Sequence, residues 1–401
     1  MSGIYEQLGI RTIINAKGVS TRVSGGIMSP EVADAMRDAS RHCVDMWELQ
    51  GRASEIIADL TGAEAGIVTS GAAAGLLLGT AACIAGLDPA KMNRLPDTAG
   101  MKDEVVMARS HRNFYDHAVR TAGAKLVEVG IPDRFSGAGV RDTEAWEIAA
   151  AITEKTAAVH YLAHPNSLPP LDQVVKAAHA AGVPVLVDAA SQLPPVENLR
   201  HFIDQGADLV TYSGGKAIGG PQSSGILCGR RDLIASAALQ CLDHDMFFEQ
   251  WNPPASLMEK SVIPGLPQHG IGRPCKAGKE EIIGLLTALR LFVADDTQAR
   301  QQMVRTALVQ DLYDALKETP HVECRLEPDG YRPGIPIVRL TLDETAAGKT
   351  AFQLILELQN GDPSIHADNS RIDDAQIGFS SICLEPGHPK AIATRMRTLL
   401  K

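Results

Sequence analysis

The sequence predicts an α/β protein with a mostly parallel sheet in a large domain and a smaller α+β domain at the C-terminus. Three observations support this prediction. A chain of 401 residues is too long for one ordinary hydrophobic core. Short apolar runs alternate with helical patterns between about residues 66 and 212, which is typical of parallel strands covered on both faces. Beyond about residue 290, apolar and polar residues alternate along IVRLTL, which indicates an antiparallel sheet with one covered face.

The elements follow in order from these patterns. Residues 1–45 read as an N-terminal arm that packs with the small domain, 46–290 as the large domain, and 291–401 as the small domain. We expect strands at 66–69, 105–108, 125–129, 157–162, 183–187 and 208–212. We expect helices between them at 72–86, 113–122, 144–153, 171–181 and 197–205. In parallel sheets of this kind, ligands bind at the carboxyl ends of the strands.

Composition and charge argue against several classes of function. A net charge of −10 gives no basic surface in bulk, which argues against a nucleic-acid partner. The most apolar run, residues 71–87, is shorter than the roughly 20 residues of a membrane span, and no secretory signal is visible. The seven cysteines contain no CxxC pair, which favours free thiols in a reducing cytoplasm over a zinc site. We therefore expect a cytoplasmic protein without a metal, a membrane or a nucleic-acid partner.

The segment DLVTYSGGKAIGGPQ, residues 208–222, places Lys216 in a tight turn after a β-rich run. Glycines on both sides let the backbone adopt unusual dihedrals and leave room beside the amine. A lysine in this position is a candidate for a Schiff base with an aldehyde cofactor. The alternative is a surface lysine in a glycine-rich loop.

Small residues follow the first strand of the large domain and open a helix: Ser70, Gly71, Ala72 and Ala73. Backbone N–H groups at such a helix start, together with the helix dipole, favour an anion. The segment is therefore a candidate phosphate site. The alternative is a simple serine cap on a buried alanine-rich helix.

Four further residues stand at strand ends. His111 has a ring that could stack on a flat cofactor. Asp188 ends an apolar strand, where a carboxylate is costly to bury unless it meets a cation such as a protonated pyridine nitrogen. The alternative role for this aspartate is to cap the next helix. Ala190 would let a ring lie flat, and the Ser213 hydroxyl could reach a phosphate. Together these features are what pyridoxal 5′-phosphate requires.

With these motifs the chain resembles the fold-type I pyridoxal-phosphate enzymes. It is specifically similar to the group that includes bacterial L-seryl-tRNA(Sec) selenium transferase and D-glucosaminate-6-phosphate ammonia-lyase. The resemblance extends over most of the chain, and the SG.K..GGPQ pattern is its most specific part. The segments that carry it are INAKGV (14–19), LTGAEAGIVTSGAAAGLLL (60–78), AGAKLVEVG (122–130), VPVLVDAAS (183–191) and DLVTYSGGKAIGGPQ (208–222).

The resemblance implies a role for each of these positions. Lys216 would form the Schiff base, Asp188 would pair with the pyridine nitrogen, and His111 would stack on the ring. Residues 70–73 and Ser213 would hold the phosphate, and Asn166 would face the cofactor. Members of the group are homodimers or larger even-numbered homo-oligomers with the site at a subunit interface.

Two departures from the group shape the expected function. The INATG-like segment begins at Ile14, which leaves no room for the RNA-binding region of the selenium transferases. The strand that carries a carboxylate-binding arginine in many fold-type I enzymes reads IGFSSICL here and has none. Arg22, Arg273 or Arg371 could substitute for it, and the sequence does not choose between them.

We therefore expect a lyase that removes water and ammonia from a small hydroxylated amino acid or amino sugar acid and gives a 2-oxo acid. A racemase or an aldolase would use the same cofactor residues, so these alternatives stay open. Selenium or sulfur transfer to a seryl carrier, and a non-catalytic cofactor-binding protein, are further alternatives.

Overall fold

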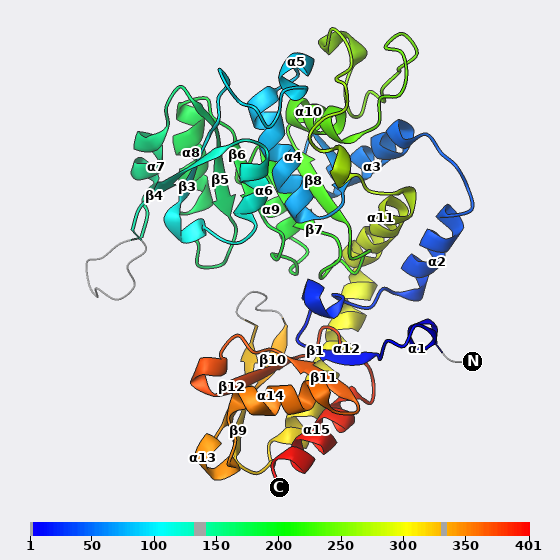
Figure 1. Ribbon diagram of the computed structural model, residues 1–401, viewed down its shortest axis with the longest axis vertical. Coiled ribbons are helices and arrows are strands. Elements are labelled where there is room, and N and C mark those ends of the chain that lie inside the picture. Colours follow the sequence, from blue (N-terminus) through cyan, green and yellow to red (C-terminus); the bar gives the residue numbers. More distant parts are fainter. Residues whose placement is uncertain (1–2, 132–141, 330–334) are drawn as a thin grey trace. The chain divides into compact units, whose positions relative to one another are not determined.

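The computed structural model describes residues 3–131, 142–329 and 335–401. By its internal contacts the chain forms two compact units, Met28–Arg290 and Met1–Ile27 with Leu291–Lys401 (Figure 1). The segment that follows Ile27 is thus grouped with the larger unit. The division into an arm of 1–45 and domains of 46–290 and 291–401 stays a prediction.

The larger unit is built around a seven-stranded sheet with the order β2-β8-β7-β6-β5-β3-β4. All neighbouring strands are parallel except β8, which is antiparallel to both β2 and β7, so the predicted mostly parallel sheet is confirmed. β8 is the one strand of this sheet that the apolar pattern did not predict. The strands are β2 (Ala65–Thr69), β3 (Glu104–Ala108), β4 (Lys125–Val129), β5 (Thr156–Leu162), β6 (Val185–Asp188), β7 (Leu209–Ser213) and β8 (Gly225–Gly229).

Helices pack around this sheet, and local signals explain where they begin and end. Asp45 caps α3 by accepting hydrogen bonds from the N–H groups of Trp47 and Glu48, and Gly62 ends it with a φ of 72°. The helices are α2 (Pro30–Ala39), α3 (Met46–Thr61), α4 (Ala72–Ala85), α5 (Pro89–Met92), α6 (Asp116–Thr121), α7 (Ala145–Ala151), α8 (Leu171–Ala180), α9 (Asn198–Asp204), α10 (Arg231–Cys241) and α11 (Lys279–Val293).

Helix α4 is the central helix of the larger unit and is apolar on nearly all sides. It packs against strands β5 to β8, and its approach to β7 requires small residues. A Cβ atom at Gly75 would lie 2.3 Å from Thr211 Oγ1. Thr211 in turn donates a hydrogen bond to the carbonyl of Ala72 at 3.2 Å. The alanine- and glycine-rich run is therefore a buried helix, as its composition predicted. No helix among the described residues is both long and apolar enough to span a membrane.

The smaller unit contains two small sheets. Strand β1 from the N-terminus pairs in parallel with β11, and β12-β10-β9 form an antiparallel sheet. The strands are β1 (Ile13–Ala16), β9 (Val322–Pro328), β10 (Pro336–Leu342), β11 (Ser364–Ala367) and β12 (Gln376–Ser380). The helices are α1 (Ile4–Gln7), α12 (Asp295–Leu316), α13 (Glu344–Ala347), α14 (Ala351–Asn360) and α15 (His388–Leu399). Leu312, Leu354 and Phe379 are completely buried in the core of this unit.

Candidate active site

The carboxyl ends of β5, β6 and β7 lie side by side and carry the predicted cofactor residues. Asp188 at the end of β6 is opposite Leu162 on one neighbouring strand and Thr211 on the other. Backbone hydrogen bonds continue the pairing past the strand ends, from Ala163 N–H to the Asp188 carbonyl at 2.9 Å and from Ala189 N–H to the Thr211 carbonyl at 3.0 Å. The loops that follow these strands are thereby held next to one another.

The loop that carries Lys216 folds back on itself. Gly214 donates its N–H to the Ser224 carbonyl at 2.9 Å, and a Cβ atom at Gly214 would lie 2.3 Å from Ser224 Oγ. A Cβ atom at Gly215 would likewise lie 2.6 Å from the backbone Cα of Gln222. Only Gly219 has a positive φ, of 77°. The expected unusual dihedrals are therefore limited to Gly219, and the glycines before the lysine serve close approach instead.

Lys216 reaches from this loop to the turn that follows β6. Its Nζ atom donates a hydrogen bond to Ser191 Oγ at 2.5 Å. Ser191 was not among the predicted site residues, although it lies in the same VPVLVDAAS segment, three residues after Asp188. Because the Ser191 hydroxyl is a hydrogen-bond partner of the amine, the structure adds this serine to the candidate site.

Asp188 is a buried carboxylate, with only 5% of its surface exposed. Burial raises the pKa of this group, while the N–H of Ala190 and the positive charge of Lys216 oppose the rise. Ala190 donates that N–H to Asp188 Oδ1 at 3.0 Å. A buried carboxylate in these surroundings is stabilised by an additional cation, and the protonated pyridine nitrogen of pyridoxal phosphate is such a cation. Asp188 and Ala190 therefore fit the cofactor.

His111 is a buried, neutral imidazole that ends a short 3-10 helix, Arg109–His111. Its ring contacts Tyr161 edge to face, with the centroids 4.8 Å apart, and its Nδ1 accepts the N–H of Leu162 at 3.5 Å. Burial first, and then His160, lowers the pKa of His111 to about 4. A hydrogen bond with the backbone of Leu168 opposes this shift. A buried, uncharged ring of this kind fits the predicted stacking on a flat cofactor.

The start of α4 offers backbone donors to an anion. Gly71 is the N-cap residue, with a φ of 138° that favours glycine, and no side chain caps the helix. Ser70 therefore does not act as the serine cap that the sequence left open. A Cβ atom at Gly71 would have no neighbour within 4 Å, so there is open space beside the N-cap residue of this helix. The backbone N–H groups at this helix start and the dipole of a 14-residue helix fit a phosphate.

Strand β8 lies between Ser213 and the segment that leads into α4. Gly225, the first residue of β8, pairs with Ser213 on one side and with Thr69 on the other. A Cβ atom at Gly225 would lie 2.5 Å from the carbonyl carbon of Gly71, so glycine is required here. The missed strand β8 is thus what brings the Ser213 and Gly71 segments together.

The remaining predicted residues are not brought to Lys216 by the described contacts. Asn166 has an exposed side chain in the turn after β5. Arg273 lies in the larger unit and donates to Asp243 Oδ2 at 2.7 Å. Arg22 and Arg371 belong to the smaller unit. The structure therefore leaves the choice of a carboxylate-binding arginine open at this point.

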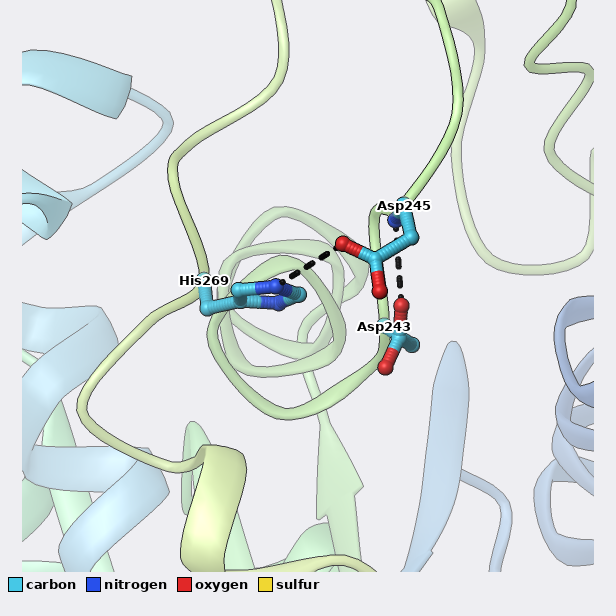
Figure 2. A group of neighbouring side chains, drawn as sticks. All are labelled: Asp243, Asp245 and His269. Carbon is cyan, nitrogen blue, oxygen red and sulfur yellow. Dashed lines mark hydrogen bonds and ion pairs between the residues drawn. The ribbon is translucent and has the colours of Figure 1, made fainter.

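Asp243, Asp245 and His269 form a separate group of side chains in the loops after α10 (Figure 2). His269 Nε2 lies 3.3 Å from Asp245 Oδ1, and the N–H of Asp245 donates to Asp243 Oδ1 at 3.0 Å. With Arg273 on Asp243, these polar groups are partners of one another. We assign no metal to them.

Comparisons with known proteins agree with this geometry. The family model "SelA: L-seryl-tRNA selenium transferase" matches residues 13–245. A 5′-C-glycyluridine monooxygenase-decarboxylase from a Streptomyces species is 33% identical over 99% of this chain and 92% of its own length. D-glucosaminate-6-phosphate ammonia lyase from Salmonella typhimurium is 30% identical over 99% of this chain and 97% of its own length.

A solved structure of D-glucosaminate-6-phosphate ammonia-lyase superposes with a TM-score of 0.80 at 29% identity, covering 100% of this chain and 98% of that one. The expected fold type, cofactor and group of relatives are thereby confirmed. The chain belongs to the L-seryl-tRNA selenium transferase family and is a fold-type I pyridoxal-phosphate enzyme.

Proposed function

We propose that this protein is a pyridoxal-phosphate-dependent ammonia-lyase. Its substrate is a small hydroxylated amino acid or amino sugar acid of the D-glucosaminate type, and its products are a 2-oxo acid and ammonia. The observation that carries this proposal is the Lys216 amine held beside the buried Asp188 carboxylate, in a chain similar along its whole length to an ammonia lyase of this kind.

When bound, pyridoxal phosphate makes the Cα–H bond of an attached amino acid acidic by withdrawing electrons into its ring. The Lys216 amine is the base for that proton, and the Ser191 hydroxyl 2.5 Å away orients it. Asp188 supplies the buried negative charge that the ring nitrogen requires. His111 would stack on the cofactor ring, and because its imidazole is neutral it does not form an ion pair with Asp188.

The proposed reaction balances without an oxidant. The Cα proton and the β-hydroxyl leave as water, and one water molecule is then consumed when the unsaturated amine hydrolyses to the 2-oxo acid and ammonia. The net change is therefore loss of ammonia alone. A racemase would return the proton to Cα, and an aldolase would break the Cα–Cβ bond, with the same cofactor residues.

A second candidate function is oxidative decarboxylation. One full-length relative is a 5′-C-glycyluridine monooxygenase-decarboxylase, so an oxygen-dependent reaction at the Cα of a glycyl-type substrate is consistent with the same fold. Oxygen dependence separates the two candidates, because the lyase needs none.

The test is a screen of the purified holoenzyme against D- and L-hydroxy amino acids and amino sugar acids, including D-glucosaminate and its 6-phosphate. Ammonia, 2-oxo acid, carbon dioxide and dissolved oxygen are measured with and without air. Equal amounts of ammonia and 2-oxo acid under both conditions support the lyase. Consumption of oxygen with release of carbon dioxide supports the second candidate. Exchange of the Cα proton without ammonia, or formation of an aldehyde, would replace both with a racemase or an aldolase.

We further propose a cytoplasmic homodimer or larger even-numbered homo-oligomer that acts on a small molecule. Selenium or sulfur transfer to seryl-tRNA is a weaker candidate because the chain is acidic. Tight tRNA binding that weakens steeply with salt would favour it over the lyase.

A further inference from the structure

Tyr161 on β5 is a buried tyrosine whose ring packs directly against His111. It is 5% exposed, and its ring meets the imidazole edge to face, with the centroids 4.8 Å apart and the planes at 82°. This arrangement of two aromatic rings is attractive because the positive edge of one ring meets the negative face of the other. In a close-packed interior, a ring at this distance also occupies space into which its neighbour would otherwise rotate. Tyr161 therefore restricts the plane of the His111 ring.

Two hydrogen bonds join the His111 ring to the end of β5 and to the turn that follows it. Its Nδ1 atom accepts the N–H of Leu162 at 3.5 Å. A second hydrogen bond joins the ring to the backbone of Leu168. The first bond is longer than the usual range of about 2.7–3.2 Å, so it holds the ring only weakly. The orientation of the ring therefore depends on where the turn holds Leu168.

Two side-chain hydroxyls fix the turn between β5 and α8. Ser167 Oγ donates to the Leu162 carbonyl at 2.7 Å, and the Tyr161 hydroxyl donates to the Pro169 carbonyl at 3.2 Å. Burial raises the pKa of Tyr161 to about 12, so the phenol stays protonated and keeps its donor. Leu168 itself is 48% exposed. Its position is therefore determined by these bonds at its two neighbours in the chain, and not by burial of its own side chain.

The same backbone also carries Asp188. Leu162 is opposite Asp188 in the pairing of β5 with β6, and the next residue, Ala163, donates its N–H to the Asp188 carbonyl at 2.9 Å. These ladder bonds hold Asp188 in the sheet independently of the turn after β5. A change in that turn can therefore tilt the His111 ring while Asp188 keeps its position.

We propose that Tyr161 is a positioning residue of the cofactor site, because it sets the plane in which the His111 ring would stack on the cofactor. Its ring restricts the imidazole, and its hydroxyl holds the Leu168–Pro169 segment to which the imidazole is bonded. Both contacts act through His111, so Tyr161 needs no contact of its own with the cofactor. The proposal rests on the predicted stacking of His111 and not on the reaction proposed for Lys216. Tyr161 was not among the residues that the sequence singled out.

The test compares Tyr161→Phe, Tyr161→Leu and His111→Leu with wild type. Each apoenzyme is titrated with pyridoxal 5′-phosphate, and the Kd is measured together with the circular dichroism of the visible cofactor band, which reports the orientation of the bound ring. His111→Leu removes the stacking and weakens cofactor binding about two- to tenfold. Tyr161→Leu approaches the same loss and reduces the dichroism. Tyr161→Phe, which lacks only the hydroxyl, changes both in the same direction by less.

A double-mutant cycle shows whether Tyr161 acts through His111. If it does, Tyr161→Phe has no further effect on the Kd or on the dichroism once His111 is leucine. Effects of the two substitutions that add in the double variant overturn the proposal, because Tyr161 would then act on the cofactor site by another route. A wild-type Kd and a wild-type dichroism in Tyr161→Leu overturn it as well.

Tyr212→Phe is the matched control for a general loss of stability. Tyr212 is a completely buried tyrosine of β7 whose hydroxyl donates to the carbonyls of Asn198 at 2.8 Å and Leu199 at 3.2 Å, so its loss removes the same kind of bond. We expect Tm to fall in both phenylalanine variants, but the dichroism to change in Tyr161→Phe alone. Equal changes in both overturn the proposal. Wild-type cofactor binding in His111→Leu overturns it together with the predicted stacking, whereas the lyase function is judged separately, by ammonia release.

Discussion

Acidification should destabilise this protein through two buried histidines of the larger unit, His111 and His160. His111 and His160 are 3% and 2% exposed, and burial lowers the pKa of each to about 4. Well above pH 6.5 neither the folded nor the unfolded chain protonates these rings, so they make no pH-dependent contribution to stability there. As the pH falls from 6.5 toward 4, the unfolded chain takes up protons that the folded chain excludes, so the free energy of unfolding falls.

The magnitude follows from the two pKa values. A histidine whose pKa drops from 6.5 to about 4 loses about 3 kcal/mol once the pH is below both values. Between pH 7 and pH 5 the loss is about 2 kcal/mol per ring, or about 4 kcal/mol for the pair. His160→Leu removes one of the two rings. The variant should therefore lose about 2 kcal/mol less than wild type over this interval.

Urea unfolding of the apoenzyme, followed by circular dichroism at pH 7 and pH 5, measures this difference. All samples need the same protein concentration, since oligomerisation contributes to apparent stability. His117→Gln, which changes an exposed histidine on α6, is the matched control and keeps the wild-type pH dependence. Equal losses of stability in wild type and His160→Leu would refute the reasoning that these rings are held neutral by burial.

Three further predictions concern the catalytic loop and its packing. Lys216→Ala should lose both the visible absorbance of the lysine-bound cofactor and all turnover; a coloured, active variant would contradict its role. Ser191→Ala should bind cofactor normally but lower kcat about tenfold, because the hydroxyl 2.5 Å from Nζ orients the amine, and an unchanged kcat would make this contact incidental. Gly75→Ala should lower the free energy of unfolding by about 1–3 kcal/mol and reduce Tm, since its Cβ would lie 2.3 Å from Thr211 Oγ1. Adding Thr211→Ala should restore part of the loss, and a Tm equal to wild type in Gly75→Ala would show that the helix can shift.

Sequence reasoning predicted those parts of the structure that depend on the local pattern of apolar and small residues. The parallel strands are nearly continuous apolar runs, so their positions and the residues at their carboxyl ends could be read directly. Lys216, Asp188 and His111 were proposed as site residues in this way, and their roles stay predictions. The helix at the predicted phosphate site was evident from its small residues, which leave its first backbone N–H groups accessible.

The features that sequence reasoning missed depend on contacts between segments that are distant in the chain. β8 has glycine at both ends and pairs antiparallel with two strands, so its pattern does not resemble that of the parallel strands beside it. Ser191 was missed because a serine after a strand has many roles, and only the folded loop brings Lys216 Nζ to its hydroxyl. Asn15 lies in the INAKGV segment, but its Nδ2 donates to the carbonyl of Gly25, ten positions away, and spacing alone does not predict such a contact.

The most specific motif of the chain is therefore explained more by packing than by chemistry. The proposed chemistry of this loop uses only the amine of Lys216, yet the surrounding SG.K..GGPQ pattern extends over ten residues. A side chain at Gly214 would collide with Ser224 and Leu285, and one at Gly215 with the backbone of Gln222. The glycines are required because the loop must turn back tightly enough to present the amine to Ser191. The motif is specific because it encodes the shape that positions one nucleophile, and variants that disturb this shape should impair activity without altering any group that reacts.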